Sequence, residues 1–172
     1  MLFSLNSLIV AASLAATVAS HGLITKPTPR GPGAASLAAC GSAVTNNIKG
    51  DLTSHVEGLP EAASKGKTYK SDQCNLLLCR GLQFADNSAN VETYTAGQTV
   101  HFDVKISIKH FETANVSVVD TKANKIVKQL LYWDKYADER LTTLPANNTA
   151  FYITIPSDLR AACATAGNCV SF

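Results

Sequence analysis

The sequence lacks the motifs that mark nucleotide-binding proteins and common hydrolases. It contains no GxGxxG or GxxxxGK motif, so no glycine-rich phosphate loop is expected. It also contains no GxSxG motif, and no cysteine stands apart as a nucleophile. Glycoside hydrolysis needs two carboxylates that flank the scissile bond. The candidate carboxylates show no distinguishing pattern, and we interpret them as solvated surface groups: Glu57, Glu61, Asp72 and Asp86.

The chain also lacks any block or stripe of basic residues. Its formal net charge is only +2, which argues against nucleic acid as a partner. No heptad, internal repeat or long amphipathic helix is visible in the sequence. A secreted enzyme that acts on a neutral polymer would have this composition, and so would many other proteins.

The first twenty residues contain no charged side chain. An apolar run over 8–18 is too short to span a bilayer and is typical of a secretory signal peptide. Small residues at Val18 and Ser20 predict cleavage before His21. No later stretch is apolar enough to anchor the chain, so we expect a secreted, extracellular, monomeric product with one domain over 21–172.

The five cysteines form no CxxC pair and do not resemble a zinc site, so disulfides are expected. Cys74 with Cys79, and Cys163 with Cys169, are close enough in sequence to close small loops. That pairing leaves Cys40 over, although spacing does not prove it. Sequons at Asn115 and Asn147 further predict a glycoprotein.

Several segments alternate as β-strands do. Within 95–110 one face carries apolar residues and the other carries polar ones, which predicts a half-buried antiparallel strand. Further short strands are predicted within 114–121, 124–134 and 150–158, and the "VSF" that ends the sequence reads as the opening of another. The segment 21–66 reads as ordered loop with room for a short helix. The predicted fold is therefore a small all-β sandwich with a long N-terminal loop region.

Four histidines remain as candidates for chemistry. His55 lies in a polar stretch and His101 on the solvent-facing side of its strand, so both are interpreted as surface residues. His110 follows the same strand at its end, where a buried histidine and a metal ligand are equally good interpretations.

His21 favours the interpretation of His110 as a metal ligand. Cleavage before it would expose an α-amine beside its own imidazole, and His110 would add a second ring nitrogen. Three nitrogens in a T-shape suit Cu(II), which prefers tetragonal nitrogen coordination. The α-amine has a low intrinsic pKa, so it can lose its proton at neutral pH. The sequence predicts a copper site on His21 and His110.

The segments "HGLITKPTPRGPGAASLAACG", "CNLLLCRGLQFADNSANVETYTAGQTV", "HFETANVSVVD" and "CATAGNCV" resemble the fungal copper-dependent lytic polysaccharide monooxygenases of auxiliary activity family 16. The resemblance covers 21–170. It implies an immunoglobulin- or fibronectin-like β-sandwich in which a histidine brace, matched here by His21 and His110, holds copper. It also implies oxidative cleavage of cellulose, mainly at C1, with an external electron donor and O2 or H2O2.

Two departures from the family pattern open alternatives. The family continues beyond the last quoted cysteine with a further strand, an aromatic stretch and a final cysteine, so the chain resembles a C-terminally truncated member. Phe111 and Glu112 also replace the small residues expected after the brace histidine. A catalytically impaired copper- or polysaccharide-binding protein is therefore the alternative, and a purely carbohydrate-binding sandwich is a third.

The identity of the substrate is inferred from the resemblance alone. Cellulose is favoured, while chitin and hemicellulose stay open, since the sequence carries no readable code for the choice. Aromatic residues that stack on sugars are sparse, and the candidates are Tyr69, Tyr94 and Trp133. For each of them a place in the core is an equally good interpretation.

Overall fold

The computed structural model describes residues 21–159 and 161–171 of the chain. The predicted signal peptide, 1–20, lies outside these residues. Helices make up 27% and strands 29% of the structure, and the strands form two small open antiparallel sheets, with no closed sandwich among the described residues. The predicted all-β, immunoglobulin- or fibronectin-like sandwich is therefore wrong, and the fold is mixed α/β.

The error lies mainly in the N-terminal third, where helices replace the expected loop. Helix α1 (Ala34–Gly50) is broken at Gly41, whose φ of 78° is not helical. On either side of this break Cys40, Val44 and Ile48 are spaced by four residues and are buried, as the inner face of a helix requires. Many of the remaining residues are small or polar, which hides this face from a search for apolar periodicity.

The second helix and the short helices after it complete this region. Helix α2 (Leu59–Lys65) begins with a proline in its first turn and carries Glu61 near its start and Lys65 near its end, which suits the helix dipole. One further helix, α3 (Ala146–Thr149), has a single turn. Four short segments are 3-10 turns: η1 (Cys79–Gly81), η2 (Phe84–Asp86), η3 (Ser88–Asn90) and η4 (Ala161–Ala164).

One sheet has the strand order β1-β2-β5. Its strands are β1 (His21–Lys26), β2 (Thr99–Ile108) and β5 (Ala150–Thr154). The alternation that predicted a half-buried strand is confirmed in β2, because Val100 and Phe102 are buried while the intervening His101 is partly exposed. β2 lies between two antiparallel neighbours, so it is the central strand.

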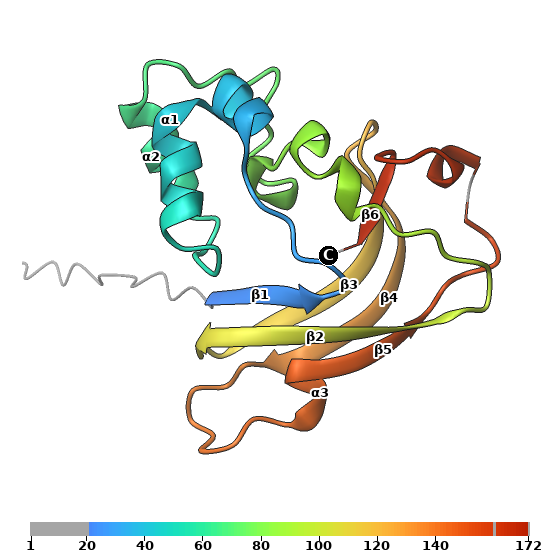
Figure 1. Cartoon of the computed structure of the whole chain (residues 1–172). Coiled ribbons are helices and arrows are strands. Elements are labelled where there is room, and N and C mark those ends of the chain that lie inside the picture. The colour runs from blue at the N-terminus through green and yellow to red at the C-terminus, as the bar shows by residue number, and fades with distance from the viewer. Residues whose placement is uncertain (1–20, 160, 172) are drawn as a thin grey trace, which may run out of the picture.

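The other sheet has the order β4-β3-β6. Its strands are β3 (Glu112–Asp120), β4 (Lys125–Tyr136) and β6 (Cys169–Ser171). The short strand expected after the last cysteine is confirmed, since β6 pairs with the end of β3. In Figure 1 the helices α1 and α2 lie together on one side of the strands, beyond β1, whereas α3 lies next to β5 on the opposite side.

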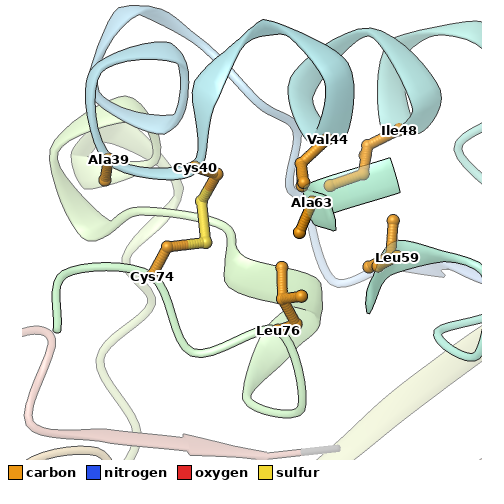
Figure 2. Packing of buried hydrophobic residues seen from close by; sticks show 8 residues of the cluster. All are labelled: Ala39, Cys40, Val44, Ile48, Leu59, Ala63, Cys74 and Leu76. Carbon is orange, nitrogen blue, oxygen red and sulfur yellow. A yellow bond between two sulfur atoms is a disulfide. The ribbon is translucent and has the colours of Figure 1, made fainter. Parts of the chain in front are cut away.

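Two separate clusters of buried side chains hold the structure together. One lies between the sheets and combines Phe102 and Phe151 of the first sheet with Val116 of the second. The other lies in the helical region, where α1 and α2 pack against the segment around Leu76; Figure 2 shows its eight members around a disulfide. The helical region thus has its own core, which stabilises helices where the sequence predicted a loop.

The disulfide pattern corrects one expectation and confirms another. Cys163 pairs with Cys169 as expected, but Cys74 pairs with Cys40, and Cys79 is left as the free thiol. The α1 helix brings Cys40 to within 5.2 Å of Cys74 between Cα atoms, the normal separation for a disulfide. Cys79 instead accepts a hydrogen bond from the Arg30 guanidinium, at 3.3 Å. Closeness in sequence predicted the Cys163–Cys169 pair but not this one, because the partner of Cys74 comes from α1, 34 residues away.

The Asp86 carboxylate closes the start of α1. It accepts hydrogen bonds from the backbone N–H groups of Gly33, Ala35 and Ser36, at 2.9, 2.8 and 2.7 Å, and from the Ser36 hydroxyl at 2.6 Å. Burial opposes its ionisation, but these hydrogen bonds outweigh burial and hold the pKa of Asp86 below its usual value. Asp86 therefore acts as a remote N-terminal cap for α1.

Replacing this carboxylate with an amide is expected to weaken the cap. In an Asp86→Asn variant we expect the free energy of unfolding at pH 7 to fall by about 1–2 kcal/mol, the usual range for a lost cap. Because the folded pKa is lowered, the stabilisation by Asp86 is present above its unfolded pKa and is lost as the pH falls below about 4. Urea unfolding at pH 7, 5 and 3 should show the two proteins converging toward pH 3. The exposed Asp72→Asn serves as control, and a difference for Asp86→Asn that stays constant with pH would contradict this account.

Candidate metal site at His21 and His110

The structure brings the two predicted ligands to the same end of one strand pair. His21 is the first residue of β1, and it lies opposite Ile108, the last residue of β2. His110 follows only two residues beyond Ile108 and is partly exposed. In Figure 1 the start of β1 and the end of β2 lie at the same edge of the sheet. Copper binding itself stays a prediction.

His21 lies in a partly enclosed place. Its side chain is 20% exposed, and its Nδ1 atom is 3.8 Å from Oδ2 of Asp51. Its ring stacks on the ring of His55, with centroids 5.2 Å apart and planes inclined by 30°. Two side chains from one loop therefore contact the candidate ligand, one at the ring face and one at the edge.

Asp51 is held as a carboxylate. Its Oδ1 atom accepts hydrogen bonds from the hydroxyl and the backbone N–H of Thr53, at 2.6 and 2.8 Å. These two bonds outweigh the effect of burial and lower the pKa of Asp51. Oδ2 remains directed at His21, so a negative charge lies near the nitrogen that would bind a metal.

The loop that carries Asp51 and His55 is fixed by Arg80. The guanidinium donates to the carbonyl oxygens of Leu52 and Asp51, at 2.6 and 3.3 Å, and to the Ser54 hydroxyl at 2.6 Å. Arg80 itself has a φ of 57°, the left-handed conformation, and lies in η1 beside the helical core. A planar guanidinium with several fixed donors is well suited to hold three groups of one loop at once.

His55 differs from the sequence interpretation. It was interpreted as an isolated surface histidine, yet it contacts His21 and also has its Nδ1 atom 3.1 Å from Oε2 of Glu57. The only signal in the sequence was the acidic residue two positions later, which is too common to be informative. The contact with His21 depends on the conformation of the loop and on its hydrogen bonds to Arg80. Neither can be predicted from the residues next to His55. His101 does occupy the exposed face, where it stacks on Tyr152.

The surface next to His110 combines apolar and cationic groups. The exposed ring of Phe111 is covered on one side by the Arg140 guanidinium, which lies 4.3 Å from the ring centroid. Arg140 also pairs with Asp138 through two bonds of 2.7 Å, and this hydrogen bonding lowers the pKa of Asp138 to about 2. The residue before His110, Lys109, donates a hydrogen bond from its ammonium to the carbonyl of Leu141, at 2.6 Å. His110 is thus flanked by an ordered rim rather than by small residues.

The three aromatic residues proposed to stack on sugars lie against the cores instead. Tyr69 packs on the helical core and donates a hydrogen bond to the Cys74 carbonyl at 2.9 Å. Tyr94 and Trp133 pack on the core between the sheets, where Trp133 meets Phe151 edge to face. The exposed aromatic side chains are others: Phe84, Phe111, Tyr132 and Tyr152. Phe111, next to a candidate ligand, is the one best placed to touch a substrate.

The residues present fit a small nitrogen-rich site better than a carboxylate cluster. Within 21–159 and 161–171, no three His, Cys, Asp or Glu side chains come together in a way that could hold a metal ion. A histidine brace has only two such side chains, the third donor being the α-amine. His21 and His110 supply these two imidazoles at one strand end, and the nearby Asp51 carboxylate favours a cation.

Comparison with models of known protein families and with curated protein sequences finds no match to this chain. In the part of the chain that the structure describes, no helix has both the length and the apolar character needed to cross a membrane. The two disulfides are consistent with an extracellular protein.

Proposed function

We propose that this protein is a secreted copper-dependent lytic polysaccharide monooxygenase that holds copper through His21 and His110. The observation that carries the proposal is the register of β1 and β2, which places His21 opposite Ile108 and therefore near His110. The segments that resemble auxiliary activity family 16 support the same reading of these two histidines. The fold is mixed α/β rather than the expected sandwich, and within it β1, in a segment expected to be loop, pairs with β2.

The chain's own groups would divide the work of binding. Cleavage before His21 frees an α-amine, which can chelate together with Nδ1 of the same residue, and His110 adds a ring nitrogen from the neighbouring strand end. Asp51 holds a negative charge 3.8 Å from Nδ1 of His21, which favours a cation there. When bound, copper would supply one-electron redox chemistry with O2 or H2O2, and an external donor would supply electrons.

The substrate would lie across the surface that surrounds His110. The exposed parts of Phe111 and Leu141 offer apolar area to the faces of sugar rings, while Lys109 and Arg140 line the same rim. A neutral β-1,4-linked polysaccharide fits this mixture, and we propose cellulose, with chitin and hemicellulose as the other substrates to test.

A second candidate is a copper- or polysaccharide-binding protein with little oxidative turnover. The Arg140 guanidinium on Phe111 favours the copper-binding form of this candidate, because a ring that is covered on one face has less area for stacking on a sugar. This candidate has the same copper ligands as the proposed monooxygenase but binds the polysaccharide less well at the surface around His110.

Three measurements in order test the proposal. N-terminal sequencing of secreted protein should give His21 first; any other start removes the amine ligand and overturns both candidates. Titration with Cu(II), followed by electron paramagnetic resonance, should show one tight type 2 site. Incubation with cellulose and ascorbate should then release oxidised oligosaccharides. Copper binding without oxidised products, on cellulose, chitin and hemicellulose alike, would favour the second candidate.

A further inference from the structure

We infer that His55 is a positioning residue that fixes the orientation of the His21 imidazole. The inference rests on the proposed function in one respect, namely that His21 is a metal ligand. It concerns a side chain to which neither the sequence motifs nor the brace assigns a role. The observation behind it is the ring stack of His55 on His21, with 5.2 Å between centroids.

The geometry of the stack excludes His55 as a further ligand of the same ion. The lone pairs of imidazole nitrogens lie in the plane of the ring. Two stacked rings with centroids 5.2 Å apart and planes inclined by only 30° therefore direct their lone pairs along separate planes rather than toward one point. His55 therefore covers a face of the His21 ring and does not itself occupy the ring nitrogens, of which Nδ1 lies 3.8 Å from Asp51.

His55 is itself held in place from two sides. Its Nδ1 atom lies 3.1 Å from the Glu57 carboxylate, which sets the rotation of its ring. The loop beneath it is fixed by the three hydrogen bonds from Arg80 to Asp51, Leu52 and Ser54. Arg80 belongs to η1, which adjoins the disulfide between Cys40 and Cys74 through Gly81. The position of the His55 ring is thus set by the rigid helical core.

A terminal histidine has a particular need for such a partner. After cleavage no preceding residue would restrain His21, so its side chain could sample several rotamers. Each rotamer that fails to chelate lowers the apparent metal affinity, because ordering must then accompany binding. A stacked ring on one face and Asp51 at the edge leave His21 few alternatives.

Copper binding by three variants with the native N-terminus tests the inference. In His55→Ala we expect Cu(II) affinity to fall about tenfold, the lower end of what partners of metal ligands contribute. The Cu(II) paramagnetic resonance lines should broaden, because several ring orientations would be populated. His55→Phe keeps a stacking ring without a nitrogen and should restore most of the affinity and the sharp lines. His101→Ala removes a histidine that stacks on Tyr152 elsewhere in β2 and should change neither.

Three results would overturn the inference, and one control separates it from the proposed function. Wild-type affinity and line shape in His55→Ala would show that the stack does not matter. A His55→Phe variant as weak as His55→Ala would show that a nitrogen, not the ring face, is required. Without any copper, stacking on His55 should shift the His21 ring proton resonances of the apoprotein, and unchanged resonances in His55→Ala would also overturn it. If the wild type binds no copper while these resonances do shift, the proposed function fails and the positioning of His21 stands.

Discussion

Replacing His110 with alanine is expected to reduce Cu(II) affinity by more than about 100-fold and to change the paramagnetic parameters of the Cu(II) that still binds. Partners that merely orient a metal ligand are already worth 10- to 100-fold in affinity, so the loss of a ligand should exceed that range. His110 is partly exposed at the end of β2, so the substitution leaves no large cavity. Isothermal titration with a competing chelator measures the change.

Two controls make this result specific. His101→Ala removes a histidine from the same strand, at 37% side-chain exposure, and should leave affinity unchanged. A single alanine inserted before His21 blocks the amine while keeping both imidazoles, and it should weaken binding as strongly as His110→Ala. Wild-type affinity in His110→Ala would show that copper binds elsewhere and would overturn the proposed site.

The strands of 99–154 were predictable because each carries its own evidence, whereas β1 lies in the segment expected to be loop. β2 alternates apolar and polar residues over its length, and the residues that pack between the sheets, Val100 and Phe102, occupy one phase of it. Strand periodicity survives even where the sheet is small, since it depends only on one buried face. The placement of His21 opposite Ile108 follows in turn from how β1 and β2 pair, and no single segment shows that register.

The helices were not predictable in this way. α1 contains Gly41 in a left-handed conformation, which interrupts the periodicity that would reveal a helix of this length. Its buried face is made of Cys40, Val44 and Ile48 on a background of small residues. What stabilises it, the packing on α2 and the capping by Asp86, comes from residues distant in the chain. A sequence pattern reports local preference, whereas this helix depends on tertiary contacts.

The contact between His55 and His21 was missed for the same reason. It is set by Arg80, which lies 26 to 29 residues from the loop groups that it holds. The disulfide error belongs here as well, because Cys40 meets Cys74 across 34 residues while Cys79, the closer neighbour, does not pair. The candidate ligands were visible in the sequence, but the residues that surround them were not.

Removing the disulfide between Cys40 and Cys74 is expected to have the largest effect on stability. The link closes a loop with a sequence separation of 34, and both cysteines are 1% exposed. Chain entropy for a loop of that length predicts a loss of about 4 kcal/mol in the free energy of unfolding for the Cys40→Ala, Cys74→Ala double variant. For a domain of this size this corresponds to a fall in Tm of about 10 °C or more. Urea and thermal unfolding measure both.

The second disulfide provides the matched comparison. The link between Cys163 and Cys169 spans only 6 residues, so the corresponding double alanine variant should lose about 2 kcal/mol. Equal losses in the two variants would show that loop entropy does not control the effect.

Removing the Cys40–Cys74 link should also weaken copper binding at the proposed site. The link adjoins Gly81, next to Arg80, and Arg80 holds the loop of His55. Below its unfolding transition, the Cys40→Ala, Cys74→Ala variant should therefore bind Cu(II) more weakly than the Cys163→Ala, Cys169→Ala variant. Equal affinities would mean that the loop keeps His55 in place without the disulfide.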